Sequence, residues 1–93
     1  MKLKFHRNAI KFLDKINDDE KQKIKAKIQS LTNIYYKTGI IPYQELQIKG
    51  LDGKWKGFYR MRVGKKRIIF GLDPINWEMN IYEIDNRGDI NKS

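Results

Sequence analysis

The sequence has no cysteine, one histidine and two serines, and each scarcity excludes a class of function. Without cysteine, neither a disulfide framework nor a thiolate metal site can form. Ser30 falls in an expected helix and Ser93 is the last residue, so no nucleophilic triad can be assembled. The single histidine, His6, is expected at the surface, and the scattered acidic residues have no histidine or cysteine near them. We therefore expect neither a cofactor nor a metal.

Long apolar runs are also missing. No stretch approaches the ~18 apolar residues of a membrane-spanning helix, and the first residues, MKLKFHRN, carry scattered charge unlike a signal peptide. Together with the lack of cysteine, this predicts a cytoplasmic protein with no membrane partner. The 93 residues, 40% of them hydrophobic, predict one folded domain over residues 1–93.

Positive charge is what the sequence has in excess, with a net charge of +9 and a pI of about 9.8. Most of it falls in residues 49–72, where eight basic residues are accompanied by one acid, Asp52. The eight are Lys49, Lys54, Lys56, Arg60, Arg62, Lys65, Lys66 and Arg67. A polyanionic partner is indicated, and charge alone leaves nucleic acid, an anionic membrane surface and an acidic protein open.

This basic stretch has the pattern of a β-hairpin. Alternation over residues 55–63 predicts a strand with Trp55 and Met61 on one face and Arg60 and Arg62 on the other. Residues 64–66 predict the turn, because glycine supplies the backbone freedom that a tight reversal needs. The return strand, residues 67–72, adds Arg67 to the face of the other two arginines.

Three guanidinium groups on one rigid face suit phosphate, because each offers a planar fork of donors and a permanent charge. Such a cluster can bind an RNA or DNA backbone. It can also stabilise the charge that develops on a phosphate attacked by a ribose 2′-hydroxyl. The alternative is that the basic residues only solvate the open side of a sheet.

The rest of the chain predicts a strand, a helical hairpin and a last strand. The expected elements are a strand at residues 2–7, a helix capped by Asn8, a helix at residues 19–37 ended by Gly39, an irregular or edge segment at 40–48, a turn at 73–76 and a strand at 77–85. In the last strand Tyr82 and Ile84 are expected on one face, opposite Met79 and Ile81. The order β-α-α-β-β-β is that of an α+β fold, with the helical hairpin packed on one face of an antiparallel sheet of three to four C-terminal strands.

With this order of elements, the sequence resembles the RelE/ParE superfamily of toxin–antitoxin toxins. The motifs that carry the resemblance are Ile48-Lys49-Gly50, Tyr59-Arg60-Met61-Arg62-Val63-Gly64, Lys66-Arg67-Ile68-Ile69-Phe70 and Ile84-Asp85-Asn86-Arg87-Gly88-Asp89-Ile90. They extend over nearly the whole chain and are more specific together than singly.

The RelE branch implies a toxin that enters the ribosomal A site, contacts rRNA there, and cuts mRNA by 2′-hydroxyl attack, leaving a 2′,3′-cyclic phosphate. A cognate antitoxin with an acidic amphipathic helix is implied as a partner. By this resemblance Arg60 and Arg62 contact the scissile nucleotide, Arg67 stabilises its phosphate, and Arg87 matches the arginine after the last strand. Further RNA contacts are expected from Lys49, Lys54, Lys56, Lys65, Lys66 and Asn91.

The chain departs from the family pattern at two places. Arg60 and Arg62 stand where a RelE toxin uses a lysine as general base, and Asn91 stands where many members have a base-stacking aromatic. The remaining candidates for a general base are Lys49, Lys65, Lys66 and Glu45. Two other functions stay open: a ParE-like or degenerate member that inhibits gyrase or the ribosome without cutting, and a plain RNA-binding domain.

Overall fold

The computed structural model describes residues 1–86. Its elements are β1 (Lys2–Phe5), α1 (Arg7–Leu13), α2 (Asp18–Thr38), β2 (Ile48–Gly50), the 3₁₀ turn η1 (Gly53–Trp55), β3 (Tyr59–Val63), β4 (Lys66–Asp73) and β5 (Glu78–Asn86). The predicted α+β fold is confirmed, including the β3–β4 hairpin. Gly64 adopts a φ of 63° in the turn between these strands, where a side chain would be strained.

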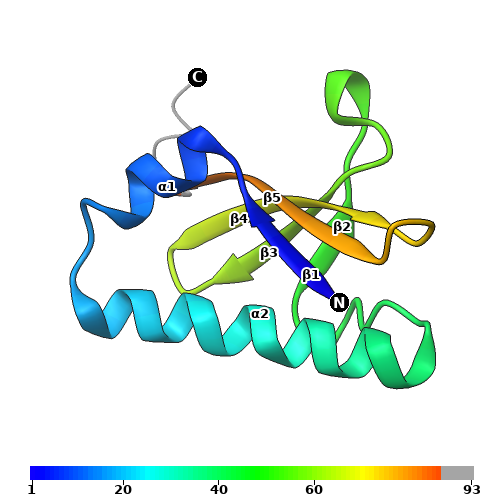
Figure 1. Ribbon diagram of the computed structural model, residues 1–93. Coiled ribbons are helices and arrows are strands. Elements are labelled where there is room, and N and C mark those ends of the chain that lie inside the picture. Colours follow the sequence, from blue (N-terminus) through cyan, green and yellow to red (C-terminus); the bar gives the residue numbers. More distant parts are fainter. Residues whose placement is uncertain (87–93) are drawn as a thin grey trace.

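The strands form one five-stranded sheet in the order β1-β5-β4-β3-β2. The four C-terminal strands pair antiparallel, as predicted, while β1 joins the sheet in parallel beside β5. β1 and β2 are therefore the edge strands at opposite ends of the sheet, although they are consecutive strands in the sequence. The first and last strands of the fold lie side by side (Figure 1).

Helix α2 covers one face of the sheet and is well capped at both ends. The Asn17 side chain accepts a hydrogen bond from the Glu20 amide, and Gly39 ends the helix in the left-handed conformation at φ 69°. The preceding helix begins at Arg7 with His6 as its N-cap residue, so the predicted cap at Asn8 was wrong. Among residues 1–86, no helix has the length and apolar character needed to span a membrane.

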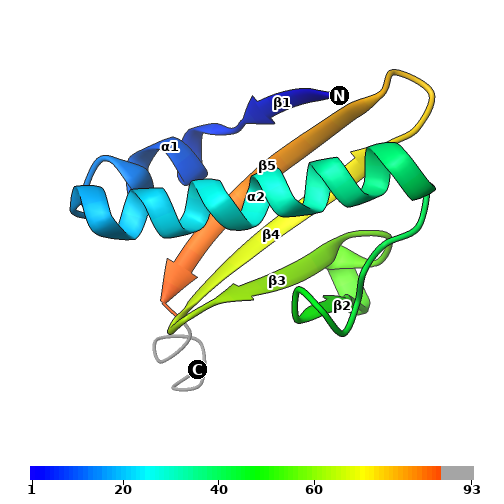
Figure 2. The same cartoon turned by 90° about the horizontal axis from the view of Figure 1, so that it is seen from below.

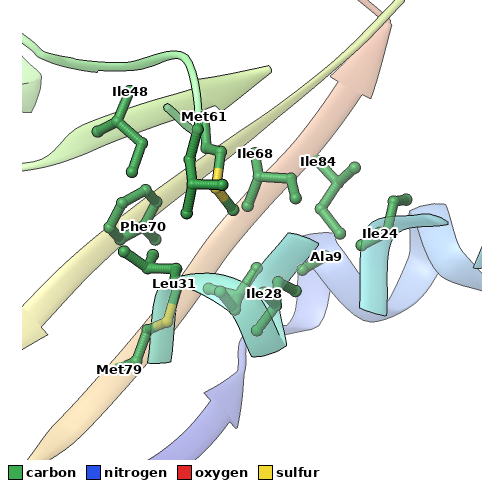
Figure 3. Close-up of a cluster of buried hydrophobic side chains, with 12 residues drawn as sticks. Ala9, Ile24, Ile28, Leu31, Ile48, Met61, Ile68, Phe70, Met79 and Ile84 are labelled. Carbon is green, nitrogen blue, oxygen red and sulfur yellow. The ribbon is translucent and has the colours of Figure 1, made fainter. Parts of the chain in front are cut away.

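The core lies between α2 and the sheet, where α2 runs across the strands (Figure 2). One stripe of the helix meets side chains from β2 to β5 that alternate toward it (Figure 3). The fully or almost fully buried members are Ala9, Ile24, Ile28, Leu31, Ile48, Met61, Ile68, Phe70, Met79, Ile81 and Ile84. Because these residues fix which face is inside, the alternate residues of β3 and β4 must occupy the other face.

A β-bulge changes the alternation in β5. Ile69 pairs with Glu83 and Phe70 pairs with Ile81, which leaves Tyr82 as an extra residue in the strand. Ile84 therefore joins Ile81 in the core, and Tyr82 lies on the opposite face. The prediction that Tyr82 and Ile84 share a face was wrong for this reason.

The segment before β3 is a loop rather than the beginning of a strand. Residues 53–55 form η1, and Gly57 adopts a φ of 94°, so alternation is broken before Tyr59. Trp55 thereby packs edge-on against Phe58 on the sheet face away from α2, which corrects its predicted position beside Met61. Phe58 sits over Gly71, where an added Cβ would come within 2.9 Å of its ring. This loop extends above the sheet, opposite α2 (Figure 1).

Candidate nucleic-acid interface

The three arginines of the hairpin lie together on the sheet face opposite α2. Arg62 of β3 is the direct cross-strand partner of Arg67 of β4, and Arg60 is two residues earlier in β3 on the same face. Their neighbours Met61 and Ile68 are fully buried on the α2 side. The predicted convergence of Arg60, Arg62 and Arg67 is therefore what the strand register produces.

Two rows of side chains extend this cluster across the sheet. In one row the partners run from Lys49 through Arg60 and Ile69 to Glu83. In the other they run from Arg62 through Arg67 to Asp85, with 3.5 Å between Arg67 Nε and Asp85 Oδ1. We call these residues the arginine face; its cations lie over β2 to β4 and its carboxylates over β5.

The charged groups of the arginine face are partly withdrawn from water. All three arginines are half-buried, and within residues 1–86 the Nε of Arg62 is buried without a hydrogen-bond partner. Like charges directly opposite each other destabilise a sheet, and a buried donor without an acceptor adds a further cost. An anion placed between Arg62 and Arg67 would relieve both. Unfavourable local placement of this kind is typical of functional sites.

The other predicted RNA-binding lysines are more dispersed. Lys49 lies beside Arg60 on the arginine face, Lys54 and Lys56 are exposed in the loop before β3, and Lys65 is exposed at the hairpin turn. Lys66 is turned to the opposite face, where it forms an ion pair with Glu20 of α2. Arg87 and Asn91 lie outside the described residues.

The ion pair between Lys66 and Glu20 explains why the pKa of the Glu20 carboxyl is shifted. The hydrogen bond from Lys66, more than the attraction of its charge, lowers the pKa of Glu20 below its usual value. Lys66 is thus engaged with the helix rather than the arginine face. Of the four candidates for a general base, Lys49 alone lies on that face, since Lys65 and Glu45 are in exposed turns.

Sequence reasoning missed the two carboxylates of the arginine face. Glu83 and Asp85 were not singled out, because simple alternation in the last strand gives no sign of the bulge that sets their register. The available signal was the spacing of the two acidic residues, at positions 83 and 85, which places both on one face of a strand. In the described part of the chain, no cluster of three or more acidic, histidine or cysteine residues could hold a metal ion.

An aromatic cluster lies beside the arginine face. The ring of Tyr82 lies 4.3 Å from His6, 4.9 Å from Phe58 and 6.1 Å from Trp55, measured between centroids. The Nε2 of His6 is also 3.2 Å from the side-chain oxygen of Asn80. His6 is therefore half-buried and in contact with neighbours, where a plain surface side chain was expected.

On the other side of the molecule, an open apolar groove of about 310 Å³ runs between β1 and α2. Apolar side chains line it, and Lys21 and Lys25 border it. The apolar residues are Leu3, Phe5, Leu13, Ile24 and Ile28. Leu3 is 41% exposed, although it belongs to a strand, because β1 is an edge and nothing in residues 1–86 covers it on this side.

Neither a protein-family model nor a curated protein matches the sequence. Solved structures do share the fold. The archaeal RelE–RelB complex from Pyrococcus horikoshii OT3 matches with a TM-score of 0.67 at 20% identity, covering 94% of both chains. The RelB–RelE complex from Methanococcus jannaschii gives 0.69 at 20% identity over 96% of this chain and 95% of that one. The YoeB–YefM complex from Staphylococcus aureus gives 0.68 at 18% identity over 91% and 94%. The chain thus has the RelE-like fold.

Proposed function

We propose that this protein is the toxin of a toxin–antitoxin pair and cleaves mRNA on the ribosome. The observation that carries the proposal is the direct opposition of Arg62 and Arg67 on a rigid, half-buried sheet face, with Arg60 beside them. The RelE-like fold supports it, because the arginines lie in the hairpin whose motif resembles that family. A nucleic-acid phosphate is the anion that a face of guanidinium groups fits best.

In the proposed reaction a ribose 2′-oxygen attacks the adjacent phosphorus and the bond to the 5′-oxygen breaks. The products are a 2′,3′-cyclic phosphate and a 5′-hydroxyl end, and the proton lost by the 2′-hydroxyl balances the one gained by the leaving oxygen. Arg62 and Arg67 stabilise the negative charge on the phosphate at the transition state. Preorganised donors of this kind typically contribute about 10²- to 10³-fold in rate each.

The arginines cannot move the protons, because guanidinium groups stay protonated in proteins. Lys49, beside Arg60, is the candidate that the chain itself offers for accepting the 2′-hydroxyl proton. A lysine side chain accepts a proton only in its neutral form, because the ammonium ion is a donor alone. Efficient cleavage then depends on the ribosome, which positions the mRNA, and free RNA is cut very slowly.

The partner in the proposed pair is an antitoxin with an acidic amphipathic segment. Its apolar side would occupy the groove between β1 and α2, with Leu3 and Ile28 in contact. Its carboxylates would meet Lys21 and Lys25 on the border of that groove. The excess positive charge of the chain favours the association, since opposite charges accelerate encounter and select the partner.

A second candidate is a toxin of the same fold that blocks its target without cutting. The observation that favours it is the same lack of a good base beside the arginines, since binding needs the charges alone. This alternative predicts RNA or ribosome binding with no new RNA ends.

Purified protein added to ribosomes programmed with a defined mRNA distinguishes these functions. The proposal expects new 5′-hydroxyl ends at the A-site codon, with no cutting of the same mRNA when ribosomes are omitted. An Arg62→Gln variant serves as the control. Stalled translation with intact mRNA would favour the non-cutting inhibitor. If translation is not stalled and the mRNA is not cut, a plain RNA-binding domain is the function that remains.

A further inference from the structure

We infer that the aromatic cluster beside the arginine face is a pocket for one unpaired nucleobase, with Glu83 selecting bases that carry an amino group. The inference rests on the proposed function for its ligand, single-stranded RNA. It adds a site that neither the hairpin motif nor the arginines account for.

The pocket is an open hollow of about 260 Å³ between the start of α1, β5 and the loop before β3. His6, Arg7, Asn8, Trp55, Tyr82 and Glu83 line it. Pockets that enclose drug-sized molecules measure about 300 to 1,000 Å³. The smaller size here suits a single planar base better than a larger ligand.

The aromatic walls are held in place by their own packing. Trp55 meets Phe58 edge-on at 5.4 Å and lies 6.1 Å from Tyr82, while Phe58 is seated on Gly71. Trp55 and Tyr82 are nevertheless only partly buried, and both line the pocket. Rigid rings that remain open to solvent are the usual stacking platforms for unpaired bases.

Glu83 gives the pocket an acceptor. The β-bulge at Tyr82 brings the two successive residues Tyr82 and Glu83 to the same cavity, where simple alternation would separate them. No ion pair of Glu83 is present within residues 1–86, despite the many cations of the chain. A carboxylate repels phosphate, but it accepts hydrogen bonds from the amino group of cytosine. Glu83 therefore favours an amino-bearing base over uracil.

The pocket is connected to the arginine face by register. Glu83 pairs with Ile69, and Ile69 pairs with Arg60, so Glu83 and Arg60 are two strands apart. That separation is about 10 Å between backbones. A nucleotide whose phosphate lies on Arg60 can thus place its base, or that of its neighbour, in the pocket.

Binding of short, equally long oligocytidylate and oligouridylate to the whole protein at one salt concentration tests the inference. The wild type should bind oligocytidylate at least about fivefold more tightly than oligouridylate, and Glu83→Gln should reduce this ratio of affinities. Trp55→Leu, which keeps apolar contact with Phe58, should weaken both by at least about fivefold. Tyr36→Leu, an exposed aromatic on α2, is the control and should change neither.

A second measurement does not depend on whether Trp55→Leu folds. In a Trp77→Phe protein, Trp55 is the only tryptophan, and oligocytidylate should quench its fluorescence whereas an abasic oligomer of equal charge should not. Equal binding of both oligomers by the wild type, or no quenching, overturns the inference. If base-selective binding is absent while ribosome-dependent cleavage is observed, only the inference of a base pocket is wrong. If base-selective binding is seen without cleavage, the pocket stands and the nuclease proposal falls.

Discussion

Arg62 and Arg67 are direct partners across β3 and β4, on the sheet face that α2 leaves open. Two cations opposite each other weaken a strand pair, whereas opposite charges would strengthen it. The hairpin keeps the unfavourable pair while the core residues on its other face pack well. The hairpin thus holds two like charges where a phosphate could bind, and Asp85 contacts one of them, Arg67.

Arg62→Gln should stabilise the free protein and weaken its binding to RNA. Removing one of two opposed charges should raise the free energy of unfolding by about 0.2 to 1 kcal/mol, and the melting temperature by up to about 8 °C for a domain of this size. Thermal unfolding and RNA titration of the same samples check the two effects. Lys54→Gln, in the exposed loop, is the control with an unchanged melting temperature. A less stable Arg62→Gln protein would contradict the proposed repulsion.

Arg67→Gln combined with Asp85→Asn should abolish growth arrest while the protein still folds. The pair is changed together because Arg67 contacts Asp85, and Arg67→Gln alone would remove one cation from a half-buried carboxylate. Loss of one charge-stabilising donor lowers the rate by about 10²- to 10³-fold. Asp85→Asn alone should keep the arrest, since it leaves Arg67 in place. Full arrest by the double variant, at equal soluble expression, would show that the arginine face only solvates the sheet.

RNA binding should depend on salt as expected for four phosphate contacts, from Lys49, Arg60, Arg62 and Arg67. For single-stranded RNA this gives a slope of about −3 in a plot of log K against log salt concentration. Lys49→Gln should reduce the slope by about 0.7, whereas Lys66→Gln should not change it, because Lys66 faces α2. Equal effects of the two lysine variants would mean that the arginine face does not define the binding surface.

The ion pair between Glu20 and Lys66 should make stability depend on acid pH. The pKa of Glu20 is lowered in the folded protein, so its contribution is full above the ordinary carboxyl pKa and is lost as pH falls through the lowered value. Glu20→Gln should therefore destabilise the protein at pH 7 and have a smaller effect near pH 3. Denaturant unfolding at both values of pH measures this difference. If Glu20→Gln lowers the free energy of unfolding equally at pH 7 and near pH 3, the ion pair is excluded as the cause.

The sequence alone was sufficient for the hairpin and the convergence of its arginines, because both depend on strict alternation and one glycine turn. The end of α2 at Gly39 was equally clear, since glycine at a left-handed position is a local signal. These features are decided by neighbours in the chain. They required no knowledge of distant contacts.

Features set by distant contacts could not be predicted in this way. The bulge at Tyr82 depends on how β5 pairs with β4, and the reversal of Trp55 depends on Phe58 resting on Gly71. Both change which residues face the arginines, so Glu83 and the aromatic cluster were missed. The parallel pairing of β1 with β5 is a contact between the two ends of the described fold, and no local pattern indicates it.

Mapping 5′ ends of transcripts after a brief induction tests the central proposal most directly. The arginine face predicts that the wild-type protein creates new 5′-hydroxyl ends within translated regions, in phase with codons at the ribosomal A site. The Arg67→Gln, Asp85→Asn double variant should create none at the same protein level. Growth arrest by the wild type without new ends in translated regions would contradict mRNA cleavage and leave a non-cutting inhibitor in its place.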